Sequence, residues 1–385
     1  RILTAIKASQ SGKWGDIQYR DWQRWSCEGT FPNAWEGRLT LQAAGTKISV
    51  PAWDPERRRF VEVECVAEYA FTESAGNLDI IVARSDDYPD ALAAAPLADV
   101  LDAPILLNPS GALNSDVRAE IARLAREAGG RSHVTVHLLG GTDALSHDVE
   151  NAIDGIPNVD TTLRYQGIDR FQTAVNIAGV TVGYYGIESE AGTRDINSYL
   201  TTGRNFPDAL SAGAAAAEND GVVLLTDGDK PDRRGFTEDF LINLRTWVND
   251  DVHLNTTENF AVGGPSAKAA ADYDIRLAAA YVGADRYETA TKTATATFSD
   301  PEYMAIVSGE NFADALVGSG FIANADGPLL LTRNAGLSPV TADYLKKNVD
   351  DGDTIVVFGG GNSVSRQVSA DVQALLDELF ELPEW

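Results

Sequence analysis

The chain has 385 residues, 57 acidic and 31 basic, and its formal net charge is −26. Such a surface repels nucleic acid and anionic membranes, which argues against both as general partners. A chain of this length is too long for one ordinary core and favours several domains. No apolar run is long enough to span a membrane. Because Arg1 follows no basic-then-apolar leader, we expect a cytosolic protein or a mature secreted one.

Residues 1–55 differ from the rest, because they hold five of the seven tryptophans. The stretch 38–50 alternates in polarity around a turn at 44–46 and predicts a β-hairpin. We therefore expect a small β-rich appendage. Its tryptophans either bury area against the neighbouring domain or form a surface that stacks on sugars or binds a partner, including a second copy of the chain. Cys27 and Cys65 form either a disulfide or two reduced thiols.

One sequence pattern occurs three times along the chain. It consists of a buried strand, a turn, a helix of small residues and a second buried strand, which together predict a βαβ unit. The central aspartate of the pattern lies at 90, 208 and 314, so the steps are 118 and 106 residues. A repeat of that length is a small domain. We predict three such domains, over residues 56–163, 164–280 and 281–385.

Each repeat continues in the same order, with a polar helix, a strand that ends in glycines, and a closing helix. Because the strands are apolar throughout, they predict α/β domains with a Rossmann-like parallel sheet covered on both faces. The polar helices are expected at 114–128, 234–248 and 339–348, and the closing helices at 146–154, 266–277 and 365–380. An opening helix is expected in every repeat, at 58–67 in the first.

The turn after the first strand of each βαβ unit supplies the first candidate binding residues. Asp87, Asn205 and Asn311 are expected to cap the following helix, and a carboxylate lies three residues further on in each repeat. These carboxylates either complete the cap or line the crevice at the carboxyl ends of the parallel strands. They are Asp90, Asp208 and Asp314, and the neighbouring Arg84 and Arg204 belong to the same candidate group.

Two further motifs recur. A glycine pair follows the third strand of each repeat and predicts either a sharp turn or a nest of backbone amides for an anion: Gly140 and Gly141, Gly263 and Gly264, Gly359 and Gly360. A Gly-x-Asp-Arg-aromatic motif stands where one repeat passes to the next, and we interpret it as inter-domain contact through a helix-capping Asp and a pairing Arg. Its members are Gly167, Asp169, Arg170 and Phe171, then Gly283, Asp285, Arg286 and Tyr287, whereas the first repeat keeps only Arg59 and Phe60.

The sequence contains no recognisable catalytic constellation. Its four histidines fall at 133, 137, 147 and 253 and form no metal-binding motif, and His133 and His137 alternate along a strand. Neither a nucleophile elbow nor a phosphate-binding Walker loop occurs, and neither cysteine is placed near a histidine. We therefore expect a protein that is not an enzyme and that has no cofactor.

The ordered set of motifs resembles the cell wall binding repeat 2 family over about residues 56–380. The resemblance rests on Gly-x-Asp-Arg-Tyr/Phe-x-Thr-Ala, on Phe-Pro-Asp-Ala-Leu, on the Pro-Ile-Leu-Leu type of strand and on the Gly-Gly turn. It implies a pseudo-threefold triangle of Rossmann-like or toprim-like domains in a noncovalently held extracellular surface protein. Its implied partner is an anionic secondary wall polysaccharide or teichoic-type polymer. The sequence departs from the family pattern at the start of repeat one and at Ala313, where the family favours proline.

The net charge raises a question about that partner. A protein with 57 acidic residues repels a polyanion unless arginines gather locally, salt screens the charges, or a divalent cation such as Ca²⁺ bridges them. Arginines on or beside the motifs could supply the local charge: Arg84, Arg170, Arg204, Arg286 and Arg333. The alternative function is a self-assembling subunit of a surface layer, sheath or filament, and a carbohydrate-processing enzyme with paired aspartates is the weakest reading.

Overall fold

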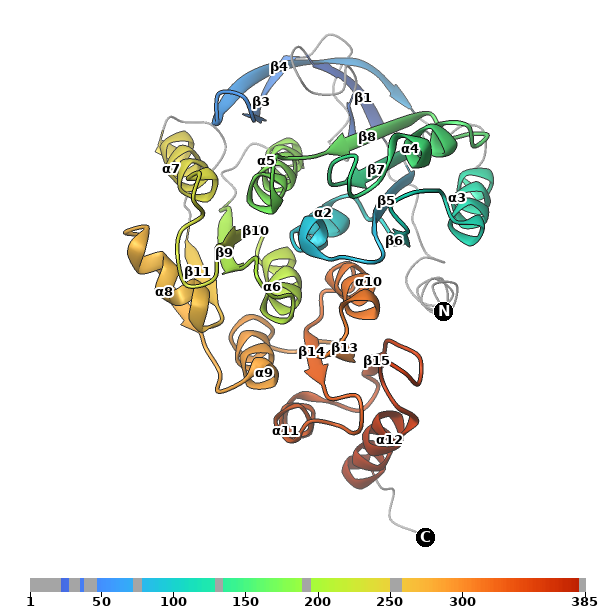
Figure 1. The fold of residues 1–385 in the computed structure, drawn as a ribbon, viewed down its shortest axis with the longest axis vertical. Coiled ribbons are helices and arrows are strands. Elements are labelled where there is room, and N and C mark those ends of the chain that lie inside the picture. The colour runs from blue at the N-terminus through green and yellow to red at the C-terminus, as the bar shows by residue number, and fades with distance from the viewer. Residues whose placement is uncertain are drawn as a thin grey trace.

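The computed structural model describes residues 22–27, 35–37, 47–71, 78–128, 134–188, 195–249 and 258–380. Its strands form three parallel sheets, one in each repeat, and one antiparallel sheet at the N-terminal side. Figure 1 shows the three repeats arranged around a common centre, with the antiparallel sheet arching over one side. The three-repeat α/β architecture predicted from the sequence is therefore confirmed.

The first repeat contains a four-stranded parallel sheet in the order β6-β5-β7-β8. Its central strand β5 has five consecutive buried residues, as expected for a strand covered on both faces. In chain order the elements are β5 (Leu78–Arg84), η2 (Pro89–Ala91), α2 (Ala94–Val100), β6 (Ile105–Asn108), α3 (Ser115–Glu127), β7 (Val134–Leu139), α4 (His147–Asp154) and β8 (Thr161–Tyr165).

The second repeat has the same strand order, β10-β9-β11-β12, and in addition begins with a long helix. Its elements are α5 (Arg170–Glu188), β9 (Asn197–Thr202), α6 (Pro207–Glu218), β10 (Gly221–Thr226), α7 (Phe236–Asn249), β11 (Asn259–Val262), α8 (Gly264–Asp272) and β12 (Ala279–Tyr281). Helix α8 ends five residues earlier than the closing helix expected at 266–277.

The third repeat has a three-stranded sheet in the order β14-β13-β15. Its elements are α9 (Arg286–Thr297), β13 (Tyr303–Ser308), α10 (Phe312–Ala323), β14 (Leu329–Thr332), α11 (Pro339–Asn348), β15 (Thr354–Val357) and α12 (Arg366–Phe380). The polar helix expected at 339–348 has these bounds in the structure.

The three central helices α2, α6 and α10 pack on one another at the centre of the molecule (Figure 1). Ala95, Ala217 and Ala323, one from each helix, form a buried cluster there. A Cβ atom added at Gly213 of α6 would lie 2.8 Å from the Cβ of Ala95. Small residues therefore let the helix backbones approach closely, and the Ala-rich helices of the repeats form the pseudo-threefold core.

The antiparallel sheet corrects one prediction. Its order is β2-β1-β4-β3, formed by β1 (Trp22–Cys27), β2 (Trp35–Gly37), β3 (Lys47–Asp54) and β4 (Arg59–Phe71). The helix expected at 58–67 is wrong, because β4 occupies this stretch. Its residues from Val61 to Cys65 alternate between apolar and acidic side chains, a period of two that favours a strand. The first strand of the expected hairpin lies outside the described residues.

The register of this sheet places Cys27 and Cys65 opposite each other on β1 and β4. Directly opposed residues of antiparallel strands have Cα atoms about 4.5–5.5 Å apart, within the span of a disulfide. The disulfide reading therefore agrees with the backbone and stays a prediction.

Two buried aromatic residues fix the antiparallel sheet to the second repeat. Trp53 and Phe60 pack on Phe240 of α7, with ring centroids 4.9 and 5.3 Å from its centroid. Gly179 of α5 lies against Trp53, and a Cβ atom added at Gly179 would overlap the Cβ of Trp53. This explains the buried tryptophan as packing between the sheet and its neighbour.

We expect Gly179→Ala to lower the thermal midpoint of the protein, although alanine is the better helix former by about 1 kcal/mol. The overlap involves a Cβ atom that a rotamer change cannot move, so the cost is on the order of 1–3 kcal/mol. Gly111→Ala is the control, because a Cβ atom there would meet nothing within 4 Å. A Gly179→Ala variant with an unchanged or higher midpoint would show that Trp53 does not constrain α5.

Candidate functional site at the repeat junctions

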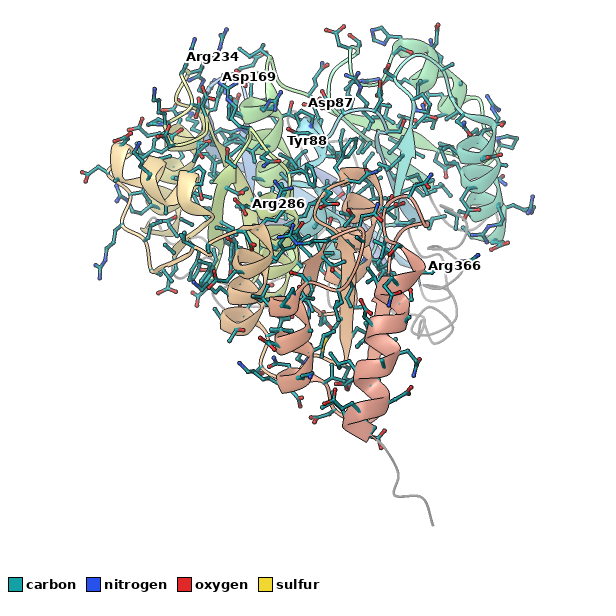
Figure 2. The ribbon with its side chains drawn as sticks, turned by 60° about the horizontal axis from the view of Figure 1, so that its bottom comes forward. Asp87, Tyr88, Asp169, Arg234, Arg286 and Arg366 are labelled. Carbon is teal, nitrogen blue, oxygen red and sulfur yellow. The ribbon has the colours of Figure 1, made fainter. Side chains whose placement is uncertain are left out.

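A pocket of about 300 Å³ lies at the junction of repeats two and three. It is formed by the turn before α6, the first residues of α8 and the segment that leads into α9. Arg286 lies near the middle of the molecule in Figure 2, where the repeats meet. The polar and glycine residues of the pocket are Asn205, Asp208, Gly264, Gly283, Asp285, Arg286 and Thr289. The structure thus gathers residues from all three predicted motifs in one place.

The aspartates of the central turns pack against the first glycine of each pair. Gly263 has a φ of +92°, and a Cβ atom added there would overlap the carboxylate of Asp208. The same atom added at Gly140 or Gly359 would lie 2.7 or 3.1 Å from Oδ2 of Asp90 or Asp314. Glycine is therefore required because the carboxylate occupies the space of a side chain. An external anion at this position would meet the protein's own negative charge.

Burial sets the charge state of these carboxyl groups. Burial raises the pKa of Asp208 to about 6, and the nearby Arg286 partly opposes this rise. Burial also raises the pKa of Asp90, while a hydrogen bond from Thr173 and the charge of Arg170 act in the opposite direction. In both cases the arginine belongs to the repeat that follows the aspartate. The Asp–Arg attraction therefore acts across the repeat junctions, as the inter-domain interpretation predicted.

The Gly-x-Asp-Arg motif is built in the same way at both junctions. Asp285 accepts hydrogen bonds from the backbone N–H groups of Tyr287 and Glu288, at 3.0 Å each, and so caps α9. The Gly283 N–H donates to the hydroxyl of Thr289 at 3.0 Å. Arg286 donates to the carbonyl of Gly309 at the end of β13. The arginine thus ties the helix start to its own repeat while facing the aspartate of the preceding one.

The junction between the first and second repeats has the same geometry. Asp169 accepts from the N–H groups of Phe171 and Gln172 at 3.1 and 3.0 Å. Arg170 donates to the carbonyl of Gly203 at 2.7 Å, and the Gly167 N–H donates to the hydroxyl of Thr173 at 3.1 Å. The capping role predicted for the motif aspartates is confirmed at both junctions.

The remaining cap residues behave unequally. Asn311 accepts from the Ala313 N–H at 3.3 Å and caps α10, as predicted. Asp87 and Asn205 instead accept from the N–H of the very next residue, at 3.0 Å each. Helix α6 has Phe206 as its N-cap and η2 has Tyr88, both without a side-chain cap, so the capping predictions for Asn205 and Asp87 are wrong. Helix α6 starts one residue later because Pro207, which has no N–H, occupies its first position.

The other predicted residues lie on the face where the strands end. Arg84 makes two hydrogen bonds to Asp86, at 2.5 and 3.1 Å, and Arg204 pairs with Asp227. Arg333 stacks over the ring of Tyr287, with its guanidinium carbon 4.8 Å from the ring centroid. Arginines thus gather near the strand ends as predicted, and the first two are each neutralised by an aspartate.

Arg59 and Phe60, proposed as the first copy of the junction motif, lie instead in β4 of the antiparallel sheet. The backbone of Asp54, Arg59 and their neighbours follows the β3–β4 ladder. Their place in the structure differs from that of Arg170 and Arg286 because this stretch is a strand, not the start of a helix.

The structure adds an aromatic cluster that sequence reasoning missed. Tyr88, Phe206 and Phe312 lie at the turn that leads into the central helix of each repeat, and their ring centroids lie 5.5–6.2 Å apart. The Tyr88 hydroxyl donates to the carbonyl of Arg204 at 3.1 Å. Figure 2 shows Asp87 and Tyr88 on the face where the strands end. The signal was present, since an aromatic residue stands two positions before the central aspartate in every repeat.

A buried histidine is satisfied by its neighbours. His137 is fully buried, with Nε2 2.7 Å from Asp79 and Nδ1 2.9 Å from the hydroxyl of Tyr165. His133 lies outside the described residues. Among the residues that the structure describes, no group of three or more His, Cys, Asp or Glu side chains could hold a metal ion. None of the described helices is long and apolar enough to cross a membrane.

The sequence matches the family described as Cell wall binding domain 2 over three segments, residues 60–150, 164–270 and 281–369. The chain belongs to the cell wall binding domain 2 family. Cell-wall binding is accordingly the function of its triple repeat, and the cell surface its place of action. Membership in this family also confirms the tandem-repeat reading of the sequence.

Similar proteins agree with this assignment. The chain is 25% identical over 303 residues to an amidase enhancer of Bacillus subtilis, covering 78% of this chain and 37% of that protein. It is 23% identical over 291 residues to the N-acetylmuramoyl-L-alanine amidase LytC of the same organism, covering 75% and 52%. The chain thus spans about half or less of the length of these relatives.

Two solved structures share the fold. Cwp6 and Cwp8 from Clostridium difficile each superpose with a TM-score of 0.62, at 21% and 22% identity. The superpositions cover 79% and 80% of this chain, and 44% and 48% of those chains. They support the fold of the three cell wall binding repeats described above.

Proposed function

We propose that the three repeats together bind an anionic secondary polymer of the cell wall, a polysaccharide or teichoic-type chain, noncovalently and outside the cell. The observation that carries this proposal is the convergence of the carboxyl ends of the central strands on one face. Arg84 ends β5, and Arg204 follows β9, where its carbonyl accepts a hydrogen bond from Tyr88 of the aromatic cluster. Arg333 follows β14 and stacks on Tyr287. A face with both arginines and aromatic rings suits a polymer that has charged groups and sugar rings.

The aspartate paired with Arg204 does not use up the guanidinium. The Arg204 side chain is 63% exposed, whereas Asp227 is 11% exposed and binds Arg204 through Nε. Displacing Arg204 from Asp227 would leave a largely buried carboxylate without its partner, so we expect a phosphate or carboxylate of the polymer to share the guanidinium with Asp227. The terminal N–H groups of the planar guanidinium can serve a phosphate in this way.

Ca²⁺ is proposed as a bridge between the polymer and surface carboxylates. The net charge of −26 is the reason, because screening or bridging must offset the repulsion between protein and polyanion. On this proposal, EDTA weakens binding to purified cell walls and added Ca²⁺ restores it. Binding that is equal in EDTA and in Ca²⁺ would rule the bridge out and leave the arginines as the sole cationic contact.

The arginine contact is tested by cosedimentation of the protein with purified cell walls. Arg84→Gln combined with Arg204→Gln is expected to weaken wall binding at least about tenfold, the effect of losing charge-assisted hydrogen bonds. The matched control is Lys346→Gln combined with Lys347→Gln at the far end of α11, which removes the same charge from another surface. An equal loss in the control would mean that only net charge matters.

Self-assembly into a surface layer, sheath or filament is the alternative proposal. Electron microscopy of the purified protein across salt and Ca²⁺ concentrations distinguishes the two. Ordered sheets or filaments would favour a structural subunit, with the N-terminal appendage as a candidate contact.

A further inference from the structure

Among the described residues, the third sheet has no counterpart of the strand that completes each of the other two. In repeats one and two the third strand is followed at the sheet edge by β8 or β12. In repeat three β15 pairs with β13 alone among the described residues, and Figure 1 shows it as the outermost strand of its sheet. Three of the four β15 residues are half-buried and one is exposed, whereas β7 is buried at five of its six positions. No described strand therefore covers the outer edge of β15.

The hydrogen-bond donors of this edge can be assigned. Thr354 and Phe358 donate their N–H groups toward β13, to Glu302 and Ile306, at 2.8 and 2.9 Å. Because alternate residues of a strand face opposite neighbours, the N–H groups of Ile355, Val357 and Gly359 point away from β13. An exposed row of this kind is a template for pairing with another strand.

The equivalent donors in the other repeats are used. The Gly140 N–H donates to the carbonyl of Tyr165 after β7, and the Gly263 N–H donates to the carbonyl of Tyr281 after β11, at 2.8 and 2.9 Å. Both glycines are buried, whereas Gly359 is exposed. Within the described part of the chain, no acceptor is found for the Gly359 N–H.

The third junction is incomplete in a second, independent way. In the first two repeats the last strand leads into a Gly-x-Asp-Arg motif whose arginine faces the central aspartate. Arg170, five residues after the end of β8, faces Asp90. Arg286, five residues after the end of β12, faces Asp208. Asp314 packs on Gly359 in the same manner as its counterparts. Among the described residues Asp314 has no ion-pair partner. The start of repeat one, which would supply the matching arginine in a closed ring of three repeats, forms β4 of the antiparallel sheet and not a Gly-x-Asp-Arg turn.

We propose that the outer edge of β15 accepts a parallel strand from another protein chain, followed by a Gly-x-Asp-Arg turn whose arginine faces Asp314. The incoming segment completes the third sheet and the third junction in the form that β8 and β12 give the others. We place this segment on another chain, since the two Gly-x-Asp-Arg arginines within residues 1–385, Arg170 and Arg286, already bind the carbonyls of Gly203 and Gly309. Asp350, Asp351 and Asp353 before β15 add a preference for a basic segment.

The probe is a fluorescent peptide with the sequence of residues 159–175, which contains β8 and the motif up to the start of a helix. Fluorescence anisotropy with the full chain is expected to show saturable binding. Changing the motif arginine of the peptide to glutamate should weaken binding at least about tenfold, because the peptide then brings a like charge to Asp314.

Three variants of the full chain locate the site. Val357→Pro removes one outward N–H and leaves the ladder to β13 intact, so it should abolish peptide binding. Val357→Thr keeps the N–H and should bind normally. Asp314→Lys leaves the strand untouched and should weaken binding of the arginine peptide while improving binding of the glutamate peptide, which keeps the test valid if the proline variant does not fold.

Two results would overturn the proposal. One is the absence of saturable binding, or binding that all three variants leave unchanged. The other is a dimer of the unmodified protein in sedimentation velocity that Val357→Pro abolishes, since the occupant of the edge would then be β15 of a second copy and not a Gly-x-Asp-Arg segment.

Discussion

Gly263→Ala is expected to lower the free energy of unfolding by about 3 kcal/mol, combining backbone strain with overpacking. Gly263 has φ +92° and ψ 150°, a region that is almost restricted to glycine. Its added Cβ atom would also overlap the carboxylate of Asp208. Urea denaturation, read as a shift of the midpoint, measures the loss.

Two further variants separate these causes. Gly264→Ala is the matched control, because its Cβ atom would lie 3.7 Å from Val282 and its φ is not positive. It should change stability by less than about 0.5 kcal/mol. Adding Asp208→Ala to Gly263→Ala should recover the part due to overlap and leave the backbone strain. Equal losses in Gly263→Ala and Gly264→Ala would contradict the packing of Asp208 on Gly263.

Asp208→Asn is expected to stabilise the protein at pH 8 and to have little effect at pH 4. The fold raises the pKa of Asp208 from its ordinary value of 3.8 to about 6. Below pH 3.8 the carboxyl is protonated in both the folded and the unfolded state, so its charge costs nothing. Between pH 3.8 and about 6 the unfolded state releases a proton that the folded state retains, so native stability falls relative to the asparagine variant, and the loss is complete above about pH 6.

The size of this effect follows from the shift in pKa. About two pKa units correspond to roughly 3 kcal/mol at a pH above 6. Denaturation curves at pH 4, 6 and 8 should show the difference between Asp208→Asn and the unmodified protein growing from pH 4 to pH 6 and levelling off by pH 8. Asp272→Asn, an exposed carboxylate at the end of α8, is the control for removing one negative charge. A difference that stays constant with pH would show that Asp208 is not desolvated in the fold.

The elements that the sequence predicted well are those with a strong local pattern. Strand β10 is an apolar run that follows a turn, and α3 spans Ser115–Glu127 behind the N-cap Asn114, where the sequence predicted a helix over 114–128. Their ends are set by neighbouring residues, so the pattern contains the needed information.

The elements that were missed depend on tertiary contacts. Strands β8 and β12 are short and only half-buried, and they form because β7 and β11 offer them an edge. Strand β4 was misread because comparison with the other repeats suggested a helix, although its own alternation indicated a strand. The repeat analogy thus outweighed the local period and gave the wrong element.

In the candidate site, too, the local features could be predicted from the sequence and the long-range contacts could not. Helix capping by Asp169 and Asp285 could be read from spacing, because it involves residues two and three positions away. The packing of Asp208 on Gly263 joins residues 55 positions apart in the sequence and required the fold. The aromatic cluster likewise follows from the pseudo-threefold axis, which brings equivalent positions of three repeats together.

Cosedimentation of the protein with purified cell walls, before and after removal of their anionic secondary polymers, tests the central claim most directly. We predict saturable binding to the intact walls, and loss of binding to walls reduced to peptidoglycan. Full binding to the stripped walls would contradict the claim that an anionic polymer is the ligand, and no binding to either preparation would contradict wall binding by this chain.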